Sequence, residues 1–259
     1  MTIRDTPWPE GTPCWVDLAV DDFRAAQSFY SELFGWSVPT GTEEFGGYST
    51  VTKNGKNVVG LMPKMDASMP TAWTTYLACD DLDATMAKVR AGGGQVVADV
   101  MDVADMGRMA LAVDPGGAFV GFWQSGAHTG FQLANEPGSV GWNENFSTDW
   151  EANKAFYRSV LGWDYDDMSG EGFQYAAFLV GDRPGGGIAP VGEGMTPHWN
   201  VYFLVADADD TVGMVKRLGG TVLQQPWDTE YGRCAAVADD QGASFMVMGA
   251  MDQESAAEV

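Results

Sequence analysis

The chain consists of two similar halves, and this repeat constrains its fold more than any other feature. Trp15 recurs 127 residues later as Trp142, and the aromatic residues, glycines and prolines that follow recur at the same offset. The offset later slips to 126 and then to 125, as two diverging copies with short deletions in loops would show. Each half is therefore predicted to hold one copy of the same folding unit. The pairs at offset 127 include Asp22/Asp149, Phe29/Phe156, Tyr30/Tyr157, Gly35/Gly162, Trp36/Trp163, Tyr48/Tyr175 and Gly60/Gly187.

The length and composition allow two globular domains. With 259 residues and 45% hydrophobic side chains, the chain can bury a substantial core in each half. Its net charge of −22 argues against nucleic acid and disfavours anionic membrane surfaces, because both carry the same sign of charge. No apolar run reaches the ~18 residues that a membrane span requires. We therefore expect neither nucleic acid nor a membrane among the partners.

The cysteines favour a reducing compartment. Cys14, Cys79 and Cys234 are odd in number and widely spaced, with no Cys-x-x-Cys pair, so free thiols are more plausible than a disulfide framework. The N-terminus shows no hydrophobic region typical of a secretory signal. These features predict a cytoplasmic location.

Hydrophobic periodicity divides each half into two quarters, each with a strand, a helix and further strands. In the first quarter the alternation over 15–20 indicates a strand, Asp22 stands where the N-cap of a helix belongs, and Gly35 is placed to end that helix. The pattern predicts an α+β chain. The expected boundaries are a first domain over 12–125, a linker over 126–138, a second domain over 139–249 and a frayed acidic tail over 250–259.

Several short motifs, repeated in order, resemble the vicinal oxygen chelate (VOC) superfamily. They are the Phe-Tyr…Leu-Phe-Gly-Trp helix end over 29–36 and the Asp-Pro-Gly-Gly turn over 114–117. More narrowly, Trp-Val-Asp-Leu over 15–18 and Trp-Asn-Glu over 142–144 are similar to tandem glyoxalase-like proteins of actinobacteria labelled "hydroxylase" or "antigen". The superfamily includes glyoxalase I, bleomycin-resistance proteins and extradiol dioxygenases. The resemblance covers about 12–249 and implies four βαβββ modules, paired into two curled sheets that each enclose a cup.

The resemblance also locates the four positions in each cup at which metal-dependent members hold a divalent ion. None of the eight is His, Asp or Glu here, and Trp, Gly and Met do not bind a hard divalent ion. We therefore predict no metal at the usual site and no cofactor, which disfavours glyoxalase I and extradiol dioxygenase activity. The positions are Trp15, Gly60, Thr74 and Gly121 in the first half and Trp142, Gly187, Asn200 and Met246 in the second.

The chain has only two histidines, so one cup cannot hold a site with two histidines and a carboxylate. His128 falls in the expected linker, where a solvated loop residue is the simplest interpretation. His198 begins an expected strand and faces the same side as Asn200 by alternation. It is either structural, or a ligand contact or general base.

The first strand of each half places a carboxylate two residues after its tryptophan, on the cup face. These residues are Asp17 and Glu144. Burial would raise the pKa of such a carboxyl group towards that of a useful base, unless a cation compensates. Arg108 and Arg233, from a repeated Gly-Arg pair, are the candidate partners. The carboxylates either form structural ion pairs with these arginines or act on a ligand as acceptor or base.

The other cup residues are largely aromatic, which suits a flat and largely apolar ligand. Gly185 and Ala189 of the second cup stand where the first has Val58 and Met62, so we expect more room in the second cup. In the first cup, large side chains can fill the space. The candidate ligand-binding residues are Trp15, Tyr76, Arg108 and Trp123 in the first half and Trp142, Phe146, Asn200, Tyr202, Arg233 and Met246 in the second.

Two functions are consistent with these features. One is a metal-independent protein that binds and sequesters a small aromatic or hydrophobic metabolite. The other is a metal-free enzyme for an isomerase, cyclase, lyase or hydroxylase-labelled tailoring step on a secondary metabolite. In that enzyme Glu144 or Asp17 would be the base, and His198, Asn200 or Tyr202 would polarise a carbonyl group. An interaction protein with unused cups is a third alternative. The sequence leaves open whether the chain is a monomer or a homodimer.

Overall fold

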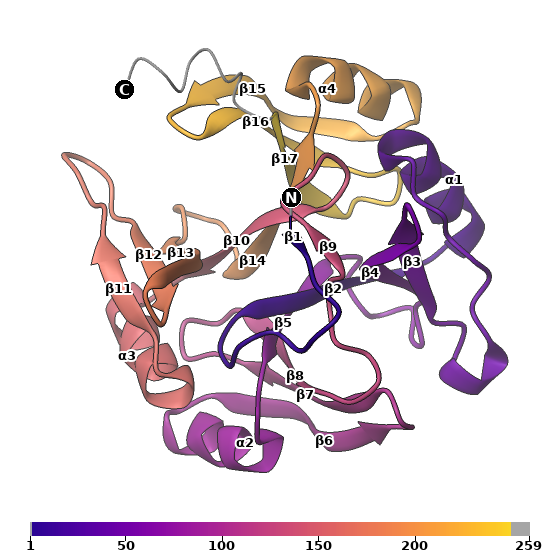
Figure 1. Cartoon of the computed structure of the whole chain (residues 1–259). Coiled ribbons are helices and arrows are strands. Elements are labelled where there is room, and N and C mark those ends of the chain that lie inside the picture. Colours follow the sequence, from indigo (N-terminus) through magenta and orange to yellow (C-terminus); the bar gives the residue numbers. More distant parts are fainter. Residues whose placement is uncertain (1, 250–259) are drawn as a thin grey trace.

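The computed structural model describes residues 2–249, so the tail predicted over 250–259 lies outside the described residues. The first half forms a seven-stranded mixed sheet in the order β3-β4-β2-β5-β8-β7-β6, with its two helices on the outside (Figure 1). Its elements are β2 (Pro13–Val20), α1 (Phe23–Phe34), the 3-10 turn η1 (Glu43–Phe45), β3 (Ser49–Lys53), β4 (Lys56–Pro63), β5 (Trp73–Ala78), α2 (Leu82–Ala91), β6 (Gln95–Val103), β7 (Gly107–Val113) and β8 (Phe119–Ser125).

The second half repeats this design as an eight-stranded sheet in the order β11-β12-β13-β10-β14-β17-β16-β15. The extra strand is β11, whose counterpart in the first half is reduced to an isolated bridge between Ser37 and Thr52. The predicted α+β fold with two tandem curled sheets is confirmed. The elements are β10 (Val140–Ser147), α3 (Trp150–Leu161), β11 (Asp164–Asp167), β12 (Ala176–Val180), β13 (Arg183–Pro190), β14 (His198–Val205), α4 (Ala208–Arg217), β15 (Thr221–Thr229), β16 (Gly232–Ala238) and β17 (Ser244–Gly249).

The segment between the sheets has structure of its own. Residues Leu133–Ala134 form strand β9, which pairs antiparallel with β1 (Thr2–Ile3). Phe131 is buried, and its carbonyl accepts a hydrogen bond from the Trp8 indole at 3.0 Å. The segment predicted as a linker therefore packs against the N-terminus, while the domain boundaries themselves stay a prediction. Among residues 2–249, no helix combines the length and hydrophobicity needed to cross a membrane.

Each hydrophobic core draws residues from both halves. In one core, Tyr30 and Phe34 of α1 pack with Phe203 of β14 and Phe245 of β17, with ring centroids 5.1–6.0 Å apart. In the other, α2 packs against α3, and Figure 1 shows the pairs α1 with α4 and α2 with α3 on opposite sides of the molecule. The halves are therefore joined by their cores and not only by the connecting segment.

Buried hydrogen bonds also join the two halves. Asp114, at the end of β7, accepts hydrogen bonds from Tyr157, Asn145 and Asn153 at 2.8–3.0 Å. Its counterpart near the C-terminus, Asp239, accepts one from the hydroxyl of Tyr30 at 3.0 Å. Burying a carboxylate costs little free energy only when donors surround it, and here the side-chain donors come from the opposite half.

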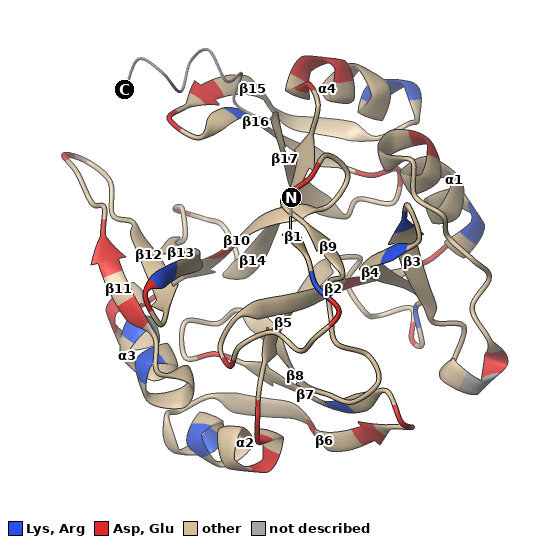
Figure 2. Ribbon diagram, viewed as in Figure 1, with Lys and Arg blue, Asp and Glu red and all other residues tan. Residues whose placement is uncertain are grey.

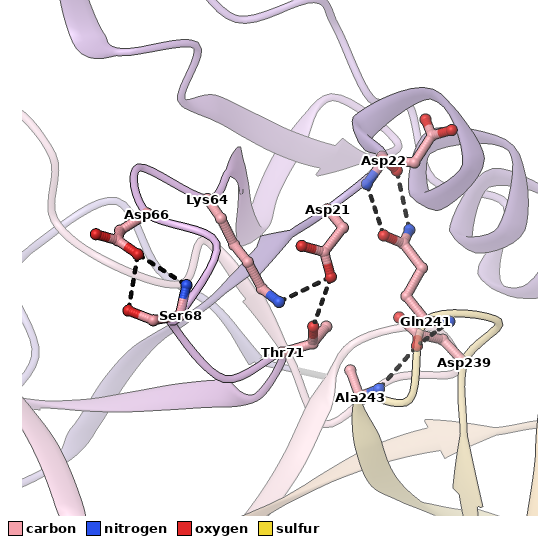
Figure 3. Close-up of polar contacts among 9 residues, drawn as sticks. All are labelled: Asp21, Asp22, Lys64, Asp66, Ser68, Thr71, Asp239, Gln241 and Ala243. Carbon is pink, nitrogen blue, oxygen red and sulfur yellow. Dashed lines mark hydrogen bonds and ion pairs between the residues drawn. The ribbon is translucent and has the colours of Figure 1, made fainter.

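The start of helix α1 shows how a turn of one half supports a helix of the other (Figure 3). Asp22 caps the helix, because its side chain accepts from the backbone amides of Arg24 and Ala25 at 2.9 and 3.0 Å. The side chain of Gln241 bonds both backbone groups of Asp22, accepting from its amide at 2.7 Å and donating to its carbonyl at 2.9 Å. The N-cap expected at Asp22 is therefore present and is held in place by the second half.

Candidate functional site

The strand pairing gathers the predicted cup residues of the second half on one face of its sheet. Glu144 lies level with Gly187 on one neighbouring strand and with Asn200 on the other. Trp142 pairs with Tyr202, which pairs with Met246. Residues that pair directly in a sheet point to the same side. The alternation in the sequence therefore placed these six residues correctly on a common surface.

This face borders a cavity of about 1390 Å³. Of the predicted residues, Trp142, Glu144, Phe146 and Tyr202 line it, whereas His198, Asn200 and Met246 share the face without lining the cavity. The prediction did not include the other walls, which come from β11 with the loop that follows it and from the β15–β16 hairpin at the opposite edge of the sheet (Figure 1). These walls include Asp166, Met168, Phe173, Tyr175, Trp227, Glu230, Tyr231 and Cys234.

Glu144 stands at the centre of a hydrogen-bond chain in this cavity. The hydroxyl of Tyr175 donates to its Oε1 at 2.8 Å, and the hydroxyl of Tyr202 donates to its Oε2. The indole of Trp142 in turn donates to the hydroxyl of Tyr175 at 3.1 Å. Every donor in this series of hydrogen bonds points towards the carboxylate of Glu144. The carboxylate is therefore fixed in position, and its remaining lone pairs can accept from further donors.

Burial decides the acidity of this group. Glu144 is only 8% exposed, and burial raises the pKa of its carboxyl group above the usual range. The hydrogen bonds from Tyr202, Tyr175 and Trp142 lower this pKa, and the charge of His198 has the smallest lowering effect. Burial prevails, so the carboxyl group takes up a proton more readily than an exposed glutamate.

The first cup has a related arrangement but is filled by side chains. Trp15, Asp17 and Tyr76 are each no more than 5% exposed, and all eight residues of β2 are buried. The indole of Trp15 donates to the hydroxyl of Tyr48 at 2.7 Å, as Trp142 does to Tyr175. Burial raises the pKa of Asp17 to about 7, with a smaller lowering effect from its hydrogen bond with Tyr76. The greater room expected in the second cup is thus present.

A residue from the connecting segment, His128, also fills the first cup. His128 packs edge-on against Trp15 with ring centroids 4.4 Å apart, and its carbonyl accepts from the indole of Trp123 at 3.0 Å. Its Nε2 is buried without a hydrogen-bond partner among the described residues, and burial lowers its pKa to about 4. The expectation of a solvated loop residue is therefore wrong, because the segment folds back over the first cup.

The arginines do not reach the cup carboxylates, so the pairing considered above is also wrong. Arg108 bonds Asp83 and Asp102 at 2.7 and 3.0 Å on the exterior. Arg233 makes the equivalent pairs with Asp209 and Asp228, the latter at 2.8 Å. The repeated Gly-Arg motif thus marks a repeated surface ion-pair triad, which leaves Asp17 and Glu144 without an arginine. Neither arginine lines the cavity.

His198 has a mainly structural environment. Its Nδ1 lies 2.7 Å from the carbonyl oxygen of Thr196, and its ring stacks on Phe146 with centroids 5.2 Å apart. It therefore packs beside Phe146 on the same face of the sheet, next to the cavity wall.

The residues at the usual metal positions do not fit a divalent ion. Gly187 and Gly60 leave space for a tyrosine, because a Cβ there would lie 2.1 Å from the hydroxyl oxygen of Tyr175 and 2.0 Å from that of Tyr48. A neutral phenol thus takes the place of an ionic ligand in both cups. Within residues 2–249, no group of three or more His, Cys, Asp or Glu side chains is arranged to hold a metal ion.

The fold and the two cups define a tandem protein of the VOC class. A family model described as the Glyoxalase/Bleomycin resistance protein/Dioxygenase superfamily matches residues 14–122, and one described as a Glyoxalase-like domain matches residues 145–248. The chain belongs to this superfamily.

Its relatives extend over nearly the whole chain. CFP32 of Mycobacterium tuberculosis, which is named as a glyoxylase, is 41% identical over 97% of this chain and 99% of its own length. The anthracycline biosynthesis protein DnrV of Streptomyces peucetius is 36% identical, with 94% of each chain covered. A Mn(II)-bound glyoxalase from Novosphingobium aromaticivorans shares the fold, with a TM-score of 0.66 and 18% identity over 94% of this chain and 84% of its own.

Proposed function

We propose that the chain is a metal-independent binding protein that holds one small aromatic or hydrophobic metabolite in its second cup. The observation that carries this proposal is the cavity of about 1390 Å³, whose walls include seven aromatic side chains and whose interior holds a single buried carboxylate. Binding sites for small molecules are typically concave, mostly apolar and equipped with a few fixed polar groups. The second cup has each of these properties.

The names of the relatives support the choice of ligand class. Two of them are called anthracycline biosynthesis proteins, and anthracyclines are flat polycyclic aromatic compounds. Aromatic walls bind flat rings by stacking and edge-to-face contacts. The glyoxylase name of CFP32 is a weaker guide, because glyoxalase chemistry uses a metal ion and the donor set in residues 2–249 does not fit one.

A metal-free enzyme is the second candidate, and one observation favours it. Glu144 is buried, lines the cavity and has a raised pKa, as a general base does. In this case Glu144 would accept a proton from a carbon acid of the ligand while Tyr175 and Tyr202 hold the carboxyl group in place. Asp17 is a poorer candidate because its cup is filled.

The binding proposal is tested by closing the cavity. Ala189 lines the second cup, and its counterpart in the filled first cup is Met62. Ala189→Met should therefore weaken binding of a flat probe such as 1,4-dihydroxyanthraquinone by at least tenfold, measured by quenching of Trp142 and Trp227 fluorescence. Met62→Ala is the matched control and should leave binding unchanged. Equal binding by both variants and the wild type would contradict the proposal.

Catalysis is distinguished from binding by following proton exchange. A bound carbon acid is incubated with the protein in D₂O, and its mass is followed over time. Deuterium incorporation that is lost in Glu144→Gln would favour the enzyme. Binding without exchange or conversion would favour sequestration.

A further inference from the structure

The charged residues that line the second cup are all of one sign. Glu144, Asp166 and Glu230 line the cavity, and no Lys, Arg or His is among the described residues that line it. Figure 2 shows acidic residues along β11 and at the β15–β16 turn, the two edges that border the cavity. Arg233, near the start of β16, lies outside the cavity lining and is held by Asp209 and Asp228. An anionic ligand would therefore meet repulsion at every charged group of the cup.

The innermost of these carboxylates, that of Glu144, is bonded by neutral groups. Its two closest contacts are the hydroxyls of Tyr175 and Tyr202, which donate hydrogen bonds but carry no charge. A carboxylate has room for about four donors, and these tyrosines occupy one site on each oxygen. A buried carboxylate that faces a cavity and makes no salt bridge is stabilised when a ligand brings a cation to it.

The walls add a second attraction for positive charge. Seven aromatic side chains border the cavity, and aromatic faces attract organic cations by cation–π interaction. The rings come from both sheet edges as well as from the floor, so they surround a ligand rather than offer one flat surface. They are Trp142, Phe146, Phe173, Tyr175, Tyr202, Trp227 and Tyr231.

We propose that the ligand of the second cup is an organic cation that joins a flat aromatic ring system, held against the aromatic walls, to a protonated aliphatic amine at Glu144. Asp166 and Glu230, which are exposed at the rim, favour the approach of such a cation. This inference rests on the proposed binding function and specifies its ligand class. Carboxylated or phosphorylated aromatic compounds are the class that the cup rejects.

Three probes of similar shape and different charge test the inference on the unmodified protein. They are 2-naphthylmethylamine, 2-naphthalenemethanol and 2-naphthoate, which at pH 7.5 are a cation, a neutral molecule and an anion. Isothermal titration should give binding of the amine at least tenfold tighter than the alcohol, with the acid weaker still. The preference should shrink as salt is raised, because the rim carboxylates are exposed.

Variants then locate the charge that matters. Glu144→Gln should reduce the preference for amine over alcohol to within threefold, because the amine loses a charged partner and the neutral alcohol does not. Asp99→Asn is the matched control, because it changes the net charge equally at an exposed residue paired with Arg90 in the other half. Asp99→Asn should keep the full preference.

The outcomes separate the two proposals. Equal binding of all three probes, lost in Ala189→Met, would leave the binding function standing and overturn the cationic ligand. Tighter binding of the naphthoate would overturn it in the same way. Failure of every probe to bind would overturn both proposals.

Discussion

Replacing Asp17 by asparagine should stabilise the protein at high pH, although the residue is buried and hydrogen-bonded. Asp17 is 4% exposed, and burial raises the pKa of its carboxyl group from 3.8 to about 7. In the unfolded chain the group loses its proton near pH 4, whereas in the folded protein it stays protonated until about pH 7. Between these values the folded state binds more protons than the unfolded state, so the free energy of unfolding falls as the pH rises.

The magnitude follows from the difference in pKa. About three units at 1.36 kcal/mol each give a loss of roughly 4 kcal/mol in the wild type between pH 4 and pH 8, of which about 2.5 kcal/mol falls between pH 5 and pH 8. An asparagine side chain at this position would not titrate, and its amide oxygen would still accept from Tyr76. The stability of the variant relative to the wild type should therefore rise by about 2.5 kcal/mol between pH 5 and pH 8.

Urea unfolding at a series of pH values measures this difference, because the other titrating groups cancel between the two proteins. Asp99→Asn is the control: hydrogen bonding from the Val100 amide and from Arg90 lowers the pKa of Asp99, so its effect lies below this pH range. A difference between Asp17→Asn and wild type that stays flat from pH 5 to pH 8 would refute the argument that burial controls this group.

Three further predictions concern the packing around the cups. His128→Phe should remove a loss of stability that the wild type shows as the pH falls from about 6.5 to about 4, since burial lowers the pKa of His128; thermal unfolding against pH measures this. Asp114→Ala should cost roughly 3 to 5 kcal/mol in urea unfolding, because three buried donors lose their acceptor, and a cost below 1 kcal/mol would contradict this. Tyr48→Phe should cost about 1 to 2 kcal/mol, because the buried indole of Trp15 loses its partner. Tyr175→Phe should cost less, because water in the cavity can replace the hydroxyl, and equal losses in the two variants would argue against an open second cup.

The resemblance to the VOC superfamily supplied the curled sheets, whereas the repeat and the alternation of residues were sufficient to predict two similar α+β halves and the face on which Glu144 lies. Both rest on local patterns, because a strand with period two assigns each side chain to a face before any partner is known. Tyr48 and Tyr175 belong to the repeat as well, and their hydroxyls lie beside Gly60 and Gly187. The same signal therefore marks both tyrosines as a matched pair.

The errors come from contacts between segments distant in sequence. The repeated Gly-Arg pair correctly indicated a structural feature, but the partners of Arg108 and Arg233 lie on the exterior and not in the cups. The burial of His128 depends on how the connecting segment crosses the first cup. Phe173 and Tyr231 lie in loops without periodicity, and only the curl of the sheet brings them to the same cavity.

The packing of helices from one half against helices of the other bears on how such a chain can evolve. In a half-length ancestor, the contacts of α1 with α4 and of α2 with α3 would form only between two copies related by a twofold axis. Such a dimer must carry two identical cups, and a mutation that fills one fills both. Once the copies are joined in one polypeptide, each can change alone. Here the first half is filled around Trp15 and His128, whereas the second half has an open cavity.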